Sequence, residues 1–153
     1  MSRKRIVGAA AATGVALLLT AVPASAHSVS ASYGYPGGDR LEANVYIANI
    51  SDWHGCGNWA TSAKLWGNNP PYASWIKNSA HFHANGVGAS ISGVSANGSG
   101  NDQSASWTNS NAWIADLSGR LCANWLTWYV SATSTATSYV PKYGSPRIVS
   151  AGI

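Results

Sequence analysis

The pattern of apolar and polar positions is densest in residues 120–130 (RLCANWLTWYV), which combine aromatic and β-prone residues with one of the two cysteines. Read with a period of two, this run has two faces. The face expected to be core holds Cys122, Leu126, Trp128 and Val130. The face expected to be surface holds Leu121, Ala123, Trp125, Thr127 and Tyr129. We therefore predict one central strand here.

The cleanest half-buried alternation lies in residues 40–50, whose inward positions are Leu41, Ala43, Val45 and Ile47. Further strands are expected at 60–66, 74–84, 87–96, 104–108, 112–117 and 131–140. In 74–84, Ile76, Ala80 and Phe82 are expected to point inward, and Asn85-Gly86 predicts a hairpin turn into 87–96.

No window keeps a helical period of about 3.6 residues. Seven or eight short strands separated by Gly/Asn turns predict an all-β chain. We expect a single antiparallel β-sandwich of Ig-like or Greek-key type over residues 39–140, with a closed barrel as the alternative. Residues 27–38 are interpreted as a flexible N-terminal arm and residues 141–153 as a flexible C-terminal tail.

The first 26 residues predict a secretory signal peptide, because Arg3, Lys4 and Arg5 precede an apolar run that ends at Ala24-Ser25-Ala26. The protein is therefore expected to be secreted and extracellular. Three of the nine basic residues lie in this leader, so six remain against five acidic residues. That balance argues against nucleic-acid binding, which needs a basic patch. No later run approaches the ~20 apolar residues of a membrane span, so no membrane insertion is expected.

The two cysteines, Cys56 and Cys122, predict one cross-fold disulfide in an oxidising compartment, with two free thiols as the alternative. The bond would close a loop of 66 residues (122 minus 56), which contributes about 4 kcal/mol on the chain-entropy model.

Histidines offer candidate metal ligands. His81 and His83 are two apart on a predicted strand, so both rings are expected on one face, a spacing that suits zinc or copper, and His54 is a candidate third ligand. Cleavage after Ala26 would make His27 the mature N-terminus. A terminal His joined by a second His resembles the copper site of lytic polysaccharide monooxygenases, which implies a copper-binding protein using His27 with His81 or His83. The alternative is a solvated strand face without metal, and we expect no cofactor.

Aromatic residues offer a second kind of site, since all eight tryptophans follow the leader. Trp75, Trp125 and Tyr129 are expected on outer faces, where such rings stack on sugars or anchor protein interfaces. One disulfide, many tryptophans and low charge are similar to small carbohydrate-binding modules, which implies a glycan partner. The alternative is that these rings belong to the core.

The two ends offer a third kind of site, in which Tyr33 and Tyr35 of the arm would anchor a secreted protein partner. Ends without a role are the alternative. There is no G-x-S-x-G elbow and no paired carboxylates, so we expect no enzyme. In size, leader, disulfide and β-content the chain resembles the small adaptor subunits of actinobacterial umbrella-type antibacterial toxin particles. This resemblance implies an adaptor that acts through protein–protein contacts, ahead of the glycan-binding and copper-binding alternatives.

Overall fold

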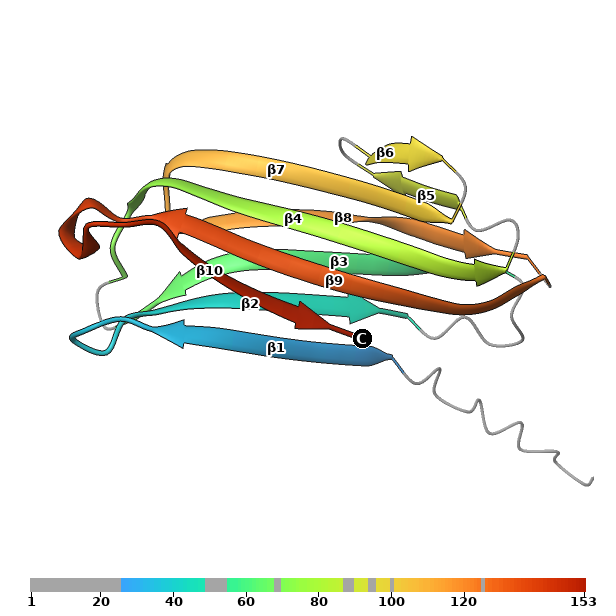
Figure 1. The fold of residues 1–153 in the computed structure, drawn as a ribbon, viewed down its shortest axis with the longest axis horizontal. Coiled ribbons are helices and arrows are strands. Elements are labelled where there is room, and N and C mark those ends of the chain that lie inside the picture. Colours follow the sequence, from blue (N-terminus) through green and yellow to red (C-terminus); the bar gives the residue numbers. More distant parts are fainter. Residues whose placement is uncertain are drawn as a thin grey trace, which may run out of the picture.

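The computed structural model describes residues 26–48, 55–67, 70–86, 90–93, 96–99, 101–124 and 126–153, with all their side chains except those of 96–99, 128 and 129. Two five-stranded sheets pack face to face (Figure 1). Sheet A holds, in spatial order, β1 (His27–Gly34), β2 (Arg40–Ile47), β3 (Gly55–Trp66), β8 (Ile114–Ala123) and β5 (Ser90–Gly93). Sheet B holds β10 (Arg147–Gly152), β9 (Thr127–Tyr139), β4 (Ala73–Gly86), β7 (Asp102–Ala112) and β6 (Ala96–Ser99).

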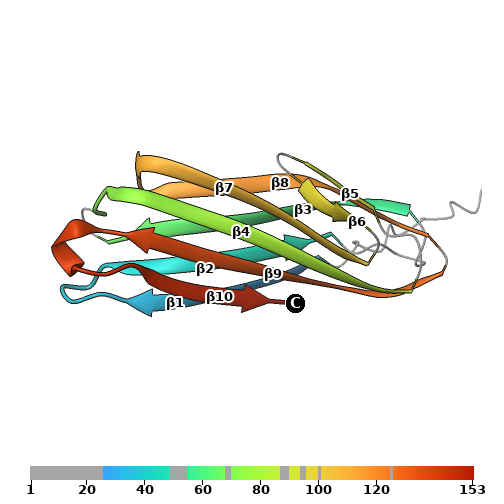
Figure 2. The same ribbon diagram turned by 45° about the horizontal axis from the view of Figure 1, so that its top comes forward.

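All neighbouring strands are antiparallel, which confirms the predicted β-sandwich. The strands of the two sheets run lengthwise in two layers (Figure 2). A short 3-10 helix, η2 (Pro141–Tyr143), connects β9 to β10. β1 and β10 are the outer strands on the same side of the sandwich (Figure 1), and each pairs with one neighbour.

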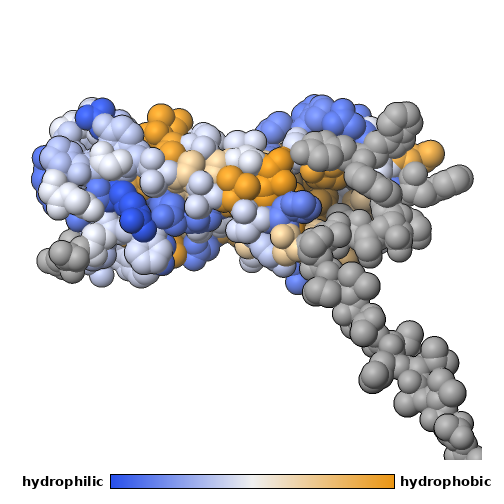
Figure 3. All heavy atoms as spheres, turned by 90° about the horizontal axis from the view of Figure 1, so that it is seen from below, coloured by the Kyte–Doolittle hydropathy of each residue, from blue (hydrophilic) through white to orange (hydrophobic). Residues whose placement is uncertain are grey.

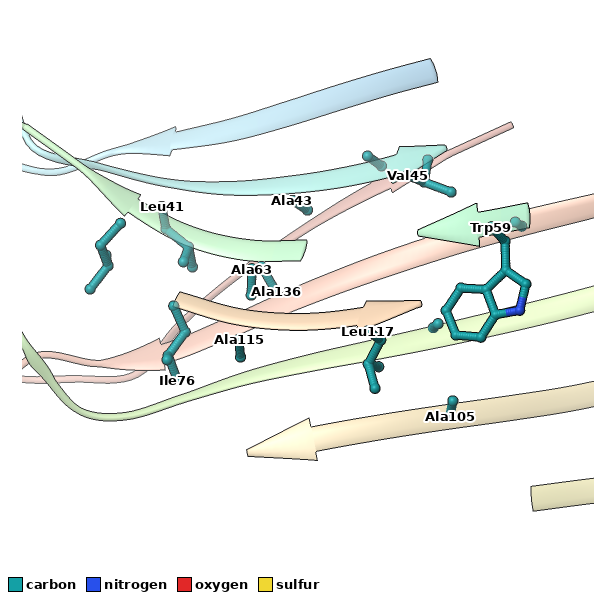
Figure 4. Close-up of a cluster of buried hydrophobic side chains, with 14 of the residues drawn as sticks. Leu41, Ala43, Val45, Trp59, Ala63, Ile76, Ala105, Ala115, Leu117 and Ala136 are labelled. Atoms are coloured by element: carbon teal, nitrogen blue, oxygen red, sulfur yellow. The ribbon is translucent and has the colours of Figure 1, made fainter. Parts of the chain in front are cut away.

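The core consists of the inward side chains of both sheets, with Leu41, Ile76 and Leu117 among those drawn in Figure 4. The predicted inward positions of β2 and the predicted Ile76, Ala80 and Phe82 of β4 are all buried. The rings of Trp59 and Phe82 meet edge to face at 4.8 Å between centroids, which joins the two sheets. The alternation in β2 and β4 therefore identified both layers of the core.

A buried polar group also links the sheets. The Asn78 amide in β4 donates to the Thr61 hydroxyl in β3 at 2.9 Å, and the Ser134 hydroxyl in β9 donates to the Asn78 carbonyl oxygen at 3.2 Å. All three side chains are buried, so each hydrogen bond is made away from water. Because the bonds need particular partners, they fix how β3 lies over β4 and β9.

The predicted central strand 120–130 is wrong in both extent and phase. β8 ends at Ala123, and the chain turns at Asn124, whose side chain accepts from the Leu126 N–H and whose carbonyl accepts from the Thr127 N–H. Leu121 is fully buried, whereas Leu126 is 46% exposed. In β8 the inward and outward faces are therefore the reverse of those predicted. The prediction failed because it assumed that Cys122 points into the core.

The disulfide Cys56–Cys122 is confirmed, but it does not cross between the sheets. The two cysteines lie opposite each other in the β3–β8 register, in phase with the outward side chains of sheet A. The bond therefore joins two neighbouring strands on the outer face of one sheet.

The structure has strands in the two segments that the sequence predicted to be a flexible arm and a flexible tail. β1 pairs with β2 over its whole length, from His27 opposite Ile47 to Gly34 opposite Arg40. β10 pairs with β9 from Arg147 to Gly152. An outer strand needs few apolar residues because most of its side chains face water, so these segments lack the pattern that reveals inner strands.

Candidate functional site

The free edge of β1 is the first candidate site. The hairpin to β2 closes with the Tyr35 N–H donating to the Asp39 carbonyl at 2.7 Å and the Gly38 N–H donating to the Tyr35 carbonyl at 3.4 Å. Gly38 has φ +88°, a conformation that glycine adopts freely in three-residue hairpin loops. Tyr35 and Asp39 therefore form a hydrogen-bonded pair at the end of the ladder.

That pair shows which residues of β1 direct their backbone N–H and C=O groups toward β2 and which direct them away. Hydrogen-bonded and non-hydrogen-bonded pairs alternate along an antiparallel ladder, so the odd-numbered residues of β1 bond to β2. The N–H and C=O groups of Ser28, Ser30 and Ser32 then point away from β2. β1 pairs with no other strand in the described part of the chain. These three residues therefore present a row of backbone donors and acceptors at the free edge.

The β1 edge also lacks the usual protection of an outer strand. Its eight residues, HSVSASYG, contain no proline and no Lys, Arg, Asp or Glu, and the register with β2 has no bulge. The outer strands β5 and β6 are only four residues long, and β10 begins with Arg147. Figure 3 shows an apolar patch on the underside of the molecule, the side on which β1 and β10 lie in Figure 1. Ser28, Ser30 and Ser32 are all exposed, so the edge is open to an added strand.

The aromatic anchors expected in the arm separate into two kinds. Tyr33 is 38% exposed, with the Arg147 guanidinium 5.5 Å from its ring centroid. Tyr35 is only 6% exposed, so the prediction that it is a surface anchor is wrong. Its hydroxyl hydrogen-bonds the Ser138 hydroxyl at 3.0 Å, its ring stacks on Tyr143 at 4.2 Å, and burial raises its pKa.

The same end of the sandwich is fastened by Asp39. Its carboxylate accepts hydrogen bonds from the Tyr143 hydroxyl and from the Lys142 ammonium, the latter at 2.9 Å. These two donors hold the pKa of Asp39 below its usual value. A cavity of about 360 Å³ lies beside this contact, with Tyr33, Pro36 and Arg147 in its lining.

The predicted aromatic platform is only partly described. Trp75 is half-buried, with its ring centroid 6.5 Å from that of Tyr139. Trp125 and the side chain of Tyr129 lie outside what the structure describes. A sugar platform built from these three rings therefore stays a prediction.

The histidine pair lies on the outer face of sheet B, where both rings approach Asp102 of β7. His83 Nδ1 is 2.8 Å from Asp102 Oδ1, and His81 Nε2 is 3.6 Å from the same oxygen. The hydrogen bond to Asp102 raises the pKa of His83. Sequence reasoning missed Asp102, since only the β4–β7 register brings it opposite His83.

Metal binding by this pair stays a prediction. Within the described ranges, no three His, Cys, Asp or Glu side chains are placed to share a metal ion, so His27 does not join His81 and His83. His54 lies outside the described residues.

Comparison of the chain with known proteins gives no relative: no family model, curated protein or solved structure matches it. Among the residues that the structure describes, no helix has the length and apolar character needed to cross a membrane.

Proposed function

We propose that this protein is a secreted, non-enzymatic adaptor that acts through protein–protein contact, with the β1 edge as its contact. The single observation that carries the proposal is the unprotected row of backbone groups at Ser28, Ser30 and Ser32. A partner segment in extended conformation adds to such an edge by main-chain hydrogen bonds. Its side chains would reach Val29 and Tyr33, both more than one-third exposed. The narrower proposal, a subunit of a secreted antibacterial toxin particle, rests on the resemblance in size, leader, disulfide and β-content.

The proposal is tested by Ser30→Pro, with Ser30→Ala as the matched control. Proline removes one N–H and places its ring where the partner strand would pair. It breaks no bond to β2, because the Ser30 N–H points outward, so Tm should change little. We expect wild type and Ser30→Ala to retain the same partner from the culture supernatant, and Ser30→Pro to lose it. Amide hydrogen exchange at Ser28, Ser30 and Ser32 should slow in the complex.

Retention of the same partner by Ser30→Pro would show that the contact lies elsewhere on the molecule. Deleting residues 27–38 is not a usable test, because it removes β1 together with the buried Tyr35. Loss of binding in that deletion would report loss of structure.

A further inference from the structure

The outer face of sheet A carries an ordered grid of small polar side chains. The strand registers place Ser30, Asn44, Ser62 and Asp116 in one row across β1, β2, β3 and β8. They place Ser28, Tyr46, Ala60 and Ser118 in the next row. Directly opposed residues of neighbouring strands share one face of the sheet. All eight residues alternate with buried residues of their own strand, or with the partly buried Ala31 in β1, so their side chains lie on the outer face. The face therefore combines hydroxyl, amide and carboxylate groups with one aromatic ring.

All residues of the two rows except Ser30 line an open hollow of about 320 Å³. Ala60 and Ser118 are small, so the surface dips between the larger Tyr46 and Asp116 side chains. Tyr46 is 38% exposed, which leaves much of its ring open to a ligand. A volume near 300 Å³ is at the lower end for small-molecule sites and suits one or two sugar rings.

The polar groups of the hollow have unused hydrogen-bonding capacity. The Asn44 amide donates to the Ser62 hydroxyl at 3.1 Å, which orients both side chains. The Asp116 carboxylate has no hydrogen bond or ion pair with any described residue, and its partial burial raises its pKa. The neighbouring Lys64 ammonium lies 3.5 Å from the centroid of the Trp66 ring, and its charge lowers the pKa of Asp116 by less than burial raises it. Asp116 therefore presents a carboxylate that has no hydrogen-bond partner among the described residues.

We propose that this hollow is a binding site for a neutral saccharide. A pyranose has an apolar C–H face that packs on an aromatic ring, and hydroxyls that bond in pairs to carboxylate and amide groups. Tyr46 supplies the ring, while Asp116, Asn44 and Ser62 supply the hydrogen bonds. The carboxylate disfavours acidic sugars. An extended peptide is disfavoured over the middle of the hollow, because β2 and β3 are paired on both sides there. The site shares only Ser28 with the proposed contact at the β1 edge: the side chain of Ser28 lines the hollow, whereas its backbone groups belong to the edge.

The site is tested by titrating the full protein with cellohexaose, chitohexaose and mannohexaose in calorimetry. Tyr46→Ala should weaken binding of the preferred oligosaccharide by about tenfold or more, through loss of stacking. Asp116→Asn should weaken it about fivefold to tenfold, because the hydrogen bonds are no longer made to a charged acceptor. Tyr72→Ala is the matched control, since Tyr72 is 63% exposed outside the hollow, and it should leave affinity unchanged.

Ser118→Arg fills the hollow without touching the aromatic ring, and it should also abolish binding while Tm is kept. Absence of binding to all three oligosaccharides would overturn the proposal. Binding that survives Tyr46→Ala and Ser118→Arg but is lost in Trp75→Ala would overturn it too, in favour of the platform on sheet B. Ser30→Pro should leave sugar affinity unchanged, so this result and that for the β1 edge are read separately.

Discussion

At the scale of single residues, two glycines make room for the indole of Trp59. Gly119 of β8 pairs with Gly93 of β5. A Cβ added to Gly119 would lie 1.9 Å from the Ser92 carbonyl oxygen and 2.9 Å from Trp59 Nε1. Neither a backbone oxygen nor a buried indole moves away cheaply. Gly119 is therefore required by a close approach of two strands.

Gly119→Ala should lower the free energy of unfolding by about 2–4 kcal/mol, because the strands must separate to admit the methyl group. Gly34→Ala is the control, since an added Cβ there meets no atom within 4 Å. Urea unfolding of the two variants checks the difference. Equal midpoints would mean that β5 does not lie against β8 in solution.

Single-residue predictions succeeded where neighbours in sequence determine burial and failed where distant residues do. Ile76 and Phe82 were identified from alternation alone. Tyr35 was placed on the surface because its partners, Ser138 and Tyr143, follow it by more than 100 positions. Asp116 attracted no functional interpretation, since its position in the hollow depends on the β3–β8 register.

At the scale of elements, the β1–β2 hairpin and η2 are joined by the Asp39 carboxylate. Tyr143 and Lys142 donate hydrogen bonds to the ionised form, so its pKa is lower in the folded chain than in the unfolded chain. This contribution to stability is complete above the unfolded value of about 4 and is lost as pH falls through the folded value.

The urea midpoints of wild type and Asp39→Asn should therefore differ most near pH 6, with wild type more stable, and converge as pH falls toward 2. Asp116→Asn is the contrasting control. Burial raises the pKa of Asp116, so ionisation above pH 4 opposes folding at that site, and the asparagine variant should not be less stable than wild type near pH 6. A constant difference between wild type and Asp39→Asn at all pH values would show that charge on Asp39 is not the cause.

The ends of strands were predictable only where a turn motif in the sequence coincides with the end of strand pairing in the fold. Asn85-Gly86 was predicted to turn a hairpin into residues 87–96, but β4 pairs with β7 and β9, and β5 lies in the other sheet. Gly86 instead marks an irregularity in the β4–β9 register, with φ +113° and an added Cβ only 2.0 Å from the Leu126 carbonyl oxygen. Glycine is needed at position 86, but it allows the close approach of the Leu126 backbone and does not form the predicted hairpin turn.

At the scale of the whole molecule, the segment after β9 completes the sandwich. Tyr143 stacks on Tyr35, and Ala151 is buried in the core. Deleting residues 141–153 should lower Tm by at least about 10 °C, because it removes these contacts, exposes the core surface that they cover and leaves β9 without its outer neighbour.

The control for that deletion is Ile148→Ser, since Ile148 is 64% exposed, and it should leave Tm nearly unchanged. Circular dichroism melts measure both variants. A truncated chain that melts like the full chain would restore the interpretation of this segment as a mobile tail.

The fold class was predictable from the whole sequence because alternation, Gly/Asn turns and the lack of a helical period all favour strands. The assignment of strands to sheets was not predictable, because it depends on pairing between distant segments. The open edge of β1 is an example: its eight residues carry no signal of their own, and only the β1–β2 register shows which backbone groups are free.

The contact between the two ends of the described chain has a consequence for how folding is timed. β1 and β10 lie together on one side, and Tyr35 meets Tyr143 across more than 100 positions of sequence. Native contacts of such long separation make folding slow, because a large loop must close before they form. A chain synthesised from its N-terminus has no partner for the Tyr35 hydroxyl or ring until Ser138 and Tyr143 follow. The arrival of η2 and β10, and not the early formation of the central strands, would then decide when this sandwich closes.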